Sequence, residues 1–353
     1  LKNYLKKNKK KIISELDVFY LENKKNLKIT ITGTNGKSTT CRLLYEIIKN
    51  HKKDVRIVGN IGNPILLEKK ITSKTIFVIE ASSYQIDYSQ YFNTDIAVIL
   101  NISPDHLERH GTIKKYVQSK FKLIKKQKKG SLSFVEKDSK YLFSKMDKKK
   151  INSKIIKVNR LFPKNFKNKI KNSYFTNINN LSNLKFILKI SKYIKLNKKI
   201  ILKTVNSFKG LKYRQQIIFN NKKLKIINDS KSTSFASSVN FLQSFENIYW
   251  IVGGKFKKGD KFILNKKYYK NIKAYIYGSK IKFFKNQFKN KIKYETVYNI
   301  KKALFKIIED SKNDNLKKII ILFSPSAASF DQFKNFEERG KYFNNQIKNI
   351  KLI

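Results

Sequence analysis

With 353 residues, 41% of them hydrophobic, the chain is long and apolar enough for two or three globular domains, which excludes a disordered protein. It carries 79 Lys and Arg against 24 Asp and Glu, a net charge of +55, but the lysines occur in every segment, which favours compositional drift over a dedicated nucleic-acid surface. No apolar run of about 18 residues predicts a membrane span. The single cysteine, Cys41, is typical of a cytoplasmic protein.

The first predicted element is a buried strand that starts at Leu27 and leads into a glycine turn. The turn is Gly33-Thr34-Asn35-Gly36-Lys37-Ser38-Thr39, and residues 41–48 repeat apolar side chains at helical spacing. Strand, glycine turn, lysine, hydroxyl and helix together direct backbone N–H groups towards phosphate. The gap between Gly33 and Gly36 is shorter than in the common nucleoside-triphosphate pattern. The turn therefore predicts a phosphate-binding loop that differs from the loop of small GTPases and helicases and is typical of a smaller group of proteins.

Two further apolar runs, 75–79 and 96–100, end in polar residues. Strands that alternate with helices indicate a parallel α/β domain, whose ligands lie beyond the carboxyl ends of the strands. Glu80 at such an end is either a ligand for Mg²⁺ or an ordinary strand-end carboxylate. His106, just past the second run, belongs to a segment that holds two of the three histidines, so it is a candidate for contact with metal or phosphate.

The strand pattern restarts near residue 210. Apolar runs at 225–227, 247–252 and 318–323 each lead into a polar turn, which predicts a second α/β domain. We expect a parallel-sheet P-loop ATPase domain over residues 1–210 and a Rossmann-like α/β domain over residues 211–353.

The motifs follow the order and spacing of a known family. Thr32–Thr39, Asn60-Ile61-Gly62, Glu80–Ser83 and Asn101–Leu107 together resemble the Mur ligases, the amino-acid ligases of peptidoglycan precursor synthesis. Residues 324–340 resemble the signature of the members that add D-glutamate. The resemblance implies that ATP phosphorylates the carboxylate of a UDP-linked muramoyl substrate and that the amine of D-glutamate then displaces phosphate.

The resemblance also implies roles for single residues. Lys37, His106 and Lys120 match catalytic positions, and Lys120 falls on the lysine that the family carbamylates. The implied ligands of two Mg²⁺ ions are Ser38, Glu80, His106 and Lys120. The implied ATP-binding residues are Gly33 to Thr39, Asn183, Arg214, Asp229 and Lys231. The implied substrate residues are Asn60, Thr233, Lys257, Ser329 and Phe336.

Family members begin with a further domain that binds the UDP part of the substrate. Only a short segment, in which residues 11–19 look like the strand and turn before the ATP domain, precedes the phosphate loop here. We therefore expect a fragment, or the product of a split or decaying gene. The expected partners are UDP-N-acetylmuramoyl-L-alanine and D-glutamate, with no specific nucleic acid, and the expected state is a monomer.

Two alternatives stay open. Another Mur ligase or a folylpolyglutamate-type ligase would share the glycine loop but lack the signature at 324–340. A basic nucleic-acid-binding P-loop ATPase is a different class of protein. DNA-stimulated ATP hydrolysis without any response to D-glutamate would identify it.

Overall fold

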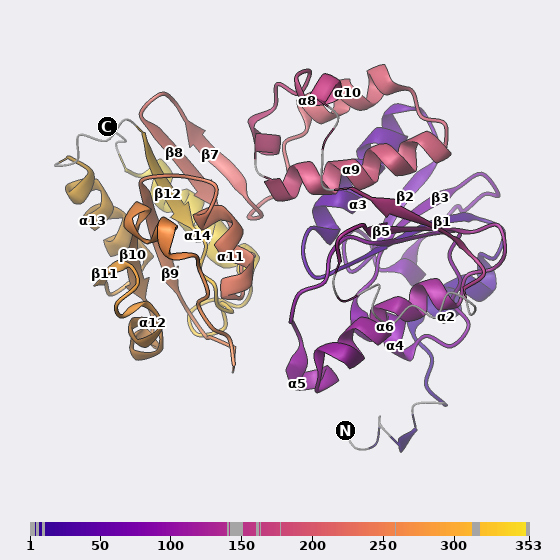
Figure 1. The fold of residues 1–353 in the computed structure, drawn as a ribbon, viewed down its shortest axis with the longest axis horizontal. Helices are drawn as coiled ribbons and strands as arrows, with labels where there is room; N and C mark the ends of the chain where they lie inside the picture. Colours follow the sequence, from indigo (N-terminus) through magenta and orange to yellow (C-terminus); the bar gives the residue numbers. More distant parts are fainter. Residues whose placement is uncertain are drawn as a thin grey trace. The chain divides into compact units, whose positions relative to one another are not determined.

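The computed structural model describes residues 4, 7, 8, 11–139, 141, 151–159, 162, 164–176, 178–257, 259–312 and 318–350. The chain divides into two compact units, Leu1–Phe208 (unit 1) and Lys209–Ile353 (unit 2) (Figure 1). The division lies next to residue 210, where the strand pattern of the sequence restarts. Each unit is an α/β structure with a six-stranded sheet, which confirms the predicted fold class.

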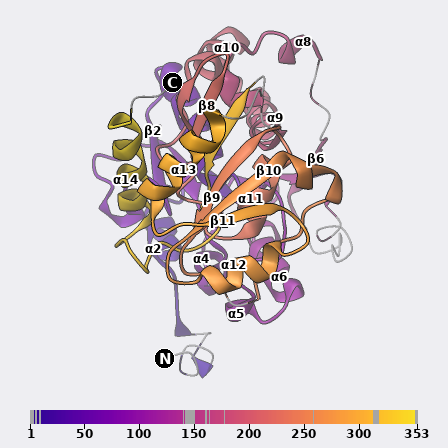
Figure 2. The same ribbon diagram turned by 90° about the vertical axis from the view of Figure 1, so that its left-hand side faces the viewer.

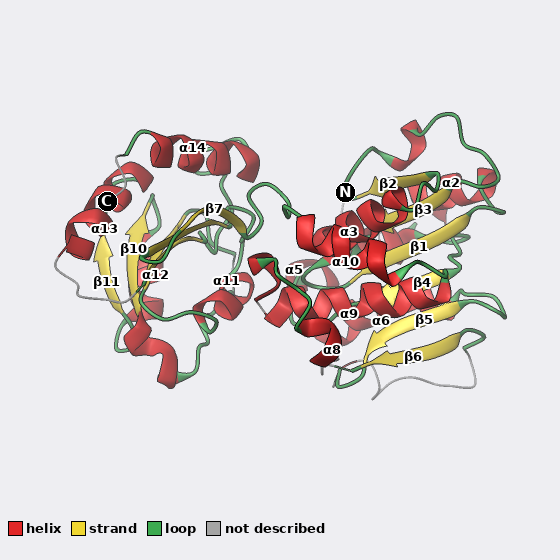
Figure 3. Cartoon of the chain, turned by 90° about the horizontal axis from the view of Figure 1, so that it is seen from above, coloured by secondary structure: helices red, strands yellow, loops and turns green. Residues whose placement is uncertain are grey.

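Unit 1 is built on six parallel strands. They are β1 (Leu27–Thr32), β2 (Val55–Gly59), β3 (Ile76–Glu80), β4 (Ile96–Ile99), β5 (Leu132–Glu136) and β6 (Lys154–Val158). Their order across the sheet is β2-β3-β1-β4-β5-β6 (Figure 3). Because parallel strands end at the same edge, the turns that follow β3, β1 and β4 are neighbours.

Helices cover both faces of this sheet. They are α2 (Glu15–Glu22), α3 (Lys37–Asn50), η2 (Ile65–Leu67), α4 (Ser83–Tyr88), α5 (Leu107–His110), α6 (Ile113–Lys125), α8 (Lys164–Lys167), η4 (Ser173–Thr176), α9 (Ile178–Tyr193) and α10 (Lys198–Ser207). Successive strand residues point to opposite faces. Val78 accordingly packs with α3, α9 and α10, whereas Phe77 and Ile79 pack with α2, α4 and α6. Figure 1 shows α9 and α10 on one side of the strands and α4 and α6 on the other.

Unit 2 repeats this design with its own sheet. The strands are β7 (Gln216–Asn220), β8 (Leu224–Asn228), β9 (Ile248–Gly253), β10 (Ile272–Tyr277), β11 (Lys293–Thr296) and β12 (Ile319–Phe323). The order is β11-β10-β9-β12-β8-β7, and only the pairing of β7 with β8 is antiparallel among the described strands. The sequence analysis found β8, β9 and β12 and missed the other three.

Figure 2 shows the helices of unit 2. They pack onto the sheet in two hydrophobic cores. They are α11 (Phe235–Leu242), η5 (Lys266–Asn271), α12 (Ile281–Phe288), α13 (Ile300–Lys312) and α14 (Phe336–Lys348). Trp250 packs with α11 and α12, whereas its strand neighbours Tyr249 and Ile251 pack with α13 and α14. In the described residues of both units, no helix has the length and apolar composition that a membrane span requires.

Candidate functional site

The turn between β1 and α3 owes its shape to two glycines. Gly33 and Gly36 have φ angles of 149° and 83°, which residues with side chains rarely adopt. A Cβ on Gly36 would lie 2.5 Å from the amide atoms of Asn183, a buried residue of α9. The fold thus brings the predicted nucleotide residue Asn183 against the loop. Gly36 also precedes α3, whose first N–H groups favour an anion.

Asn101, the residue two positions after β4, holds the loop from its other side. The Asn101 side chain accepts a hydrogen bond from the Asn35 N–H at 2.9 Å and donates one to the Asn35 carbonyl at 3.0 Å. The Asn101 carbonyl accepts from the Thr34 N–H at 3.0 Å. Sequence analysis placed Asn101 in a family motif but gave it no role. These bonds fix the loop before any ligand binds, which reduces the entropy cost of binding.

Lys37 folds back over the loop. Its ammonium donates hydrogen bonds to the carbonyls of Gly33 at 2.9 Å and Thr34 at 2.8 Å. Ser38 is buried in the first turn of α3. Thr34 Oγ1 lies 3.1 Å from the hydroxyl of Tyr116, a residue of α6 that the sequence analysis passed over. The loop therefore combines a cation, a hydroxyl and backbone N–H groups, which is the chemistry of a phosphate site.

Glu80 and Asn60 meet at the carboxyl ends of β3 and β2. Glu80 is 2% exposed, and its Oε1 accepts a hydrogen bond from Asn60 Nδ2 at 3.3 Å. The Asn60 N–H donates to the Glu80 carbonyl at 2.9 Å. Glu80 Oε2 is buried without a hydrogen-bond partner in the described structure. An unsatisfied buried carboxylate oxygen is costly, and a bound cation would offset that cost.

Lys120 is buried beside the loop. Its ammonium donates a hydrogen bond to Thr32 Oγ1 at 3.2 Å and lies 4.8 Å from the ring centre of Tyr116. Burial, and secondarily the positive charge of Lys37, lowers its pKa well below the ordinary value of 10.5, whereas Asp105 and Glu80 act in the opposite direction. A lysine in such surroundings holds its proton weakly, so the free amine, which is the reactive form, becomes accessible.

His106 adopts a left-handed backbone conformation, with φ of 53°, just before α5. Its Nδ1 lies 2.8 Å from the Tyr84 hydroxyl and 3.4 Å from Glu108 Oε1, and its Nε2 lies 3.5 Å from Asp105 Oδ2. The second histidine of this segment, His110, is buried, with Nε2 3.0 Å from Ser83 Oγ, and burial lowers its pKa. His106 is therefore the more accessible of the two histidines for contact with a ligand.

No three His, Cys, Asp or Glu side chains of the described residues form a cluster that could hold a metal ion by themselves. The predicted metal ligands are instead a mixed set, in which a hydroxyl and a lysine accompany one carboxylate and one histidine. Phosphate oxygens of a nucleotide and water commonly complete such a set for Mg²⁺.

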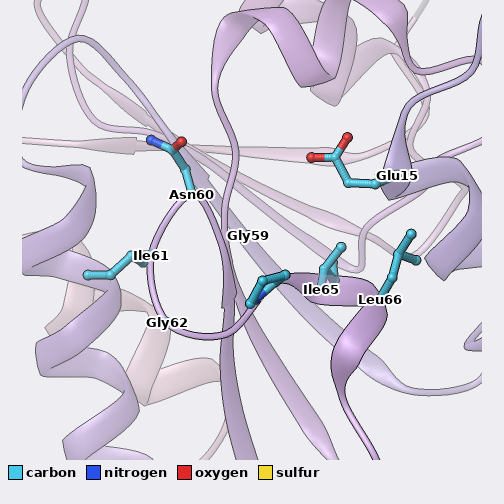
Figure 4. Close-up of a pocket in the computed structure, with 8 residues that line it drawn as sticks. Glu15, Gly59, Asn60, Ile61, Gly62, Ile65 and Leu66 are labelled. Atoms are coloured by element: carbon cyan, nitrogen blue, oxygen red, sulfur yellow. The ribbon is translucent and has the colours of Figure 1, made fainter.

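A cavity of about 320 Å³ lies next to Asn60 (Figure 4). Its lining residues are Glu15, Gly59, Asn60, Ile61, Gly62, Pro64, Ile65 and Leu66. Glu15 comes from α2, and Ile65 and Leu66 come from η2, so the cavity lies between the predicted substrate residue Asn60 and these two helices. Sequence analysis did not anticipate it, because the lining segments are distant in the chain.

In unit 2, three of the residues that are predicted to bind the amino-acid substrate follow three adjacent strands. Thr233 comes after β8, Lys257 after β9 and Ser329 after β12. All three positions therefore lie beyond the same edge of a parallel sheet, where α/β proteins bind ligands. Ser329 is 3% exposed, whereas Thr233 and Lys257 are half-buried.

Two of the three residues of unit 2 that are predicted to bind the nucleotide, Lys231 and Arg214, lie near Phe336. The ammonium of Lys231 lies 4.0 Å from the Phe336 ring centre, and the Arg214 guanidinium lies 5.8 Å from it. Asp229 accepts hydrogen bonds from the Gln215 N–H and Ser324 Oγ, both at 3.1 Å. Burial raises the pKa of Asp229 to about 7, against the opposing effect of these hydrogen bonds and of Arg214.

Sequence analysis assigned no role to Arg339, although this residue belongs to the segment 324–340. It is 1% exposed and donates hydrogen bonds to Ser230 Oγ at 3.1 Å, the Ser230 carbonyl at 2.7 Å and the Ala327 carbonyl at 2.9 Å. These bonds join α14 to the turns after β8 and β12. The sequence signal that could have identified Arg339 was its place within the long motif at 324–340.

Comparisons with known proteins agree with this geometry. The model of the Mur ligase middle domain matches residues 31–202. The chain is 34% identical to a UDP-N-acetylmuramoylalanine–D-glutamate ligase of Rickettsia bellii and 35% identical to that of Rickettsia prowazekii, in each case over 94% of the chain and 78% of the relative. The solved MurF ligase of Thermotoga maritima, in complex with ADP, has a TM-score of 0.66 at 16% identity and covers 95% of this chain and 85% of that one.

Proposed function

The chain belongs to the Mur ligase family, and on that premise we propose that it is an ATP-dependent ligase that adds D-glutamate to UDP-N-acetylmuramoyl-L-alanine in peptidoglycan precursor synthesis. The observation that carries this proposal is the 34% identity, over 94% of the chain, to a ligase named for this reaction. The Thermotoga relative in complex with ADP supports ATP as the nucleotide. The segment 324–340, which resembles the D-glutamate signature, favours this reaction over that of another Mur or folylpolyglutamate-type ligase.

In this reaction the γ-phosphoryl group of ATP passes to a carboxylate oxygen of the muramoyl substrate, and ADP leaves. The amine of D-glutamate then attacks the carbonyl carbon of the acyl phosphate, the bond to phosphate breaks, and the nitrogen loses a proton. Both steps need several negative charges held close together. Lys37 and the N–H groups of residues 33–39 would hold the phosphates, with Asn183 against the loop.

The residues present fit Mg²⁺. The buried Oε2 of Glu80 has no hydrogen-bond partner among the described residues, and Ser38 adds a hydroxyl. We assign Ser38 and Glu80 to one ion, and His106 with Lys120 to a second. Carbamylation of Lys120, which its depressed pKa favours, would convert this cation into an anion able to support the ion. Bound Mg²⁺ would neutralise phosphate charge during the transfer.

In unit 2 we assign Arg214, Asp229 and Lys231 to the nucleotide. Asn60 would contact the muramoyl substrate, and the residues for D-glutamate are Thr233, Lys257, Ser329 and Phe336. A dicarboxylate needs donors at both ends, which a lysine, two hydroxyls and a backbone N–H supply. We propose residues 1–210 as the ATP-binding domain and 211–353 as the amino-acid-binding domain of a cytoplasmic monomer.

The test is phosphate release by the protein expressed from its complete coding sequence. ATP, Mg²⁺ and UDP-N-acetylmuramoyl-L-alanine are supplied with D-glutamate, L-glutamate, meso-diaminopimelate or L-lysine. We expect release with D-glutamate well above that with the other three. Equal rates with all four amino acids, or none with D-glutamate, would contradict the proposal. DNA added without substrates tests the nucleic-acid-binding alternative, which predicts stimulated ATP hydrolysis.

A further inference from the structure

The ring of His106 is held by a tyrosine on another element. Tyr84 lies in the first turn of α4, whose start is fixed by Ser82: the Ser82 side chain accepts from the Gln85 N–H at 3.2 Å, and the Gln85 side chain accepts from the Ser82 N–H at 2.7 Å. This capping box sets the direction of Tyr84. The Tyr84 hydroxyl then lies 2.8 Å from His106 Nδ1.

Tyr84 is itself held from two sides. Its ring stacks on that of His110 at 5.6 Å, and the Arg109 guanidinium lies 5.1 Å from its centre. The His106 side chain is 35% exposed and projects from a left-handed residue, and its ring packs edge-on against the ring of Tyr84, with the centroids 5.0 Å apart. The hydrogen bond to Tyr84 is therefore a main restraint on the orientation of His106.

The bond is compatible with a tautomer that leaves Nε2 available to a metal ion. The Tyr84 hydroxyl oxygen, 2.8 Å from His106 Nδ1, can accept a hydrogen bond from that nitrogen. A neutral imidazole has one N–H. Carboxylates lie near both ring nitrogens, with Glu108 Oε1 3.4 Å from Nδ1 and Asp105 Oδ2 3.5 Å from Nε2, so they do not choose between the two tautomers. In the tautomer with its proton on Nδ1, that N–H donates to Tyr84 and the lone pair lies on Nε2.

We propose that Tyr84 is a positioning residue for His106, whose Nδ1–H it accepts so that Nε2 faces Mg²⁺. The inference rests on the proposed function, in which His106 is a ligand of that ion. Metal-binding histidines commonly donate their second ring N–H to a fixed acceptor, and loss of the acceptor typically weakens metal binding by about 10- to 100-fold. Tyr84 would be that acceptor here, supplied by the helix that follows Glu80.

The test compares Tyr84→Phe with Tyr88→Phe in the full-length protein. Both substitutions remove one hydroxyl from α4, but that of Tyr88 accepts from Arg109 at 2.6 Å and does not contact His106. Mn²⁺ affinity in the presence of ADP is measured by electron paramagnetic resonance, and the ¹⁵N shifts of His106 report its tautomer. We expect Tyr84→Phe to weaken Mn²⁺ binding about tenfold or more and to mix the tautomers. Tyr88→Phe should change neither by more than about twofold.

His106→Ala distinguishes an error in the positioning role of Tyr84 from an error in the metal role of His106. If it weakens Mn²⁺ binding but Tyr84→Phe changes neither the affinity nor the ¹⁵N shifts, the positioning role is wrong and the metal role stands. If His106→Ala leaves Mn²⁺ affinity unchanged, the proposed metal role of His106 is wrong. Circular dichroism shows whether each variant folds. If Tyr84→Phe does not fold, Tyr84→Trp, which also lacks the hydroxyl acceptor, replaces it under the same criteria.

Discussion

Replacement of Gly36 by alanine tests the contact between the phosphate loop and Asn183. At φ 83° a residue with a side chain carries a backbone penalty of about 1–2 kcal/mol. The added Cβ would also lie 2.5 Å from the Asn183 amide atoms, closer than a van der Waals contact, so Asn183 or the loop must move. Overpacking of this kind costs about 1–3 kcal/mol. We therefore expect Gly36→Ala to lower the free energy of unfolding by about 2–5 kcal/mol.

Gly130 offers a matched control. Its φ is 89°, and a Cβ there would meet nothing within 4 Å, so Gly130→Ala measures the backbone penalty alone. Urea unfolding gives the stabilities, and titration calorimetry gives the affinity for ADP, which we expect Gly36→Ala to lower about tenfold or more. In a double-mutant cycle, Asn183→Ala should restore the overpacking part of the lost stability. Equal stability of the two glycine variants, with unchanged ADP affinity, would refute the reasoning.

Three further predictions concern buried charges. Between about pH 4 and 7 the folded state keeps a proton on Asp229 that the unfolded state has released, so the free energy of unfolding should fall by on the order of 1 kcal/mol for each unit of rising pH. Urea titrations should show that Asp229→Asn removes this fall, and an unchanged dependence on pH in the variant would contradict the prediction. Glu80→Gln removes a buried charge whose Oε2 has no hydrogen-bond partner within the described part of the chain, so thermal stability should not drop while Mn²⁺·ADP affinity falls at least about tenfold. Intact Mn²⁺ affinity would count against the metal role. Arg339→Lys should cost about 3 kcal/mol in urea unfolding and raise the KM for D-glutamate, whereas Arg42→Lys, in a half-buried pair with Glu46 on one helix, should cost under about 0.5 kcal/mol. Similar losses for the two variants would refute a special role for Arg339.

Two of the strands that sequence analysis missed, β10 and β11, have an apolar pattern broken by polar residues. Strands buried on both faces, such as β3 and β9, appear as continuous apolar runs and are readily found. β11, at the edge of its sheet, has only one apolar residue, Tyr294, and β10 is interrupted by Lys273, whose ammonium pairs with Asp310 on α13. An edge strand or a charge satisfied by a distant partner breaks the apolar pattern without breaking the strand.

The local parts of the candidate site were accessible in the same way. The glycine turn at residues 33–39 is defined by spacing within one segment, because backbone geometry at a turn depends on the residues that form it. The resemblance of residues 324–340 to a family signature likewise needs only one continuous segment. Asn101, Tyr84 and Arg339 were not given roles, since each acts through a partner far away in the chain.

The sequence by itself determined the phosphate loop, the alternation of strands and helices, and the family of the protein, because each depends on residues that are close in the chain. Only the tertiary structure decided that Asn183 packs on Gly36, that Glu80 keeps one buried oxygen to which no described residue donates a hydrogen bond, and that Lys120 lies buried beside Thr32. Among so many lysines, composition gives Lys120 no distinction. Its depressed pKa comes from desolvation, a property of the folded surroundings and not of the residue.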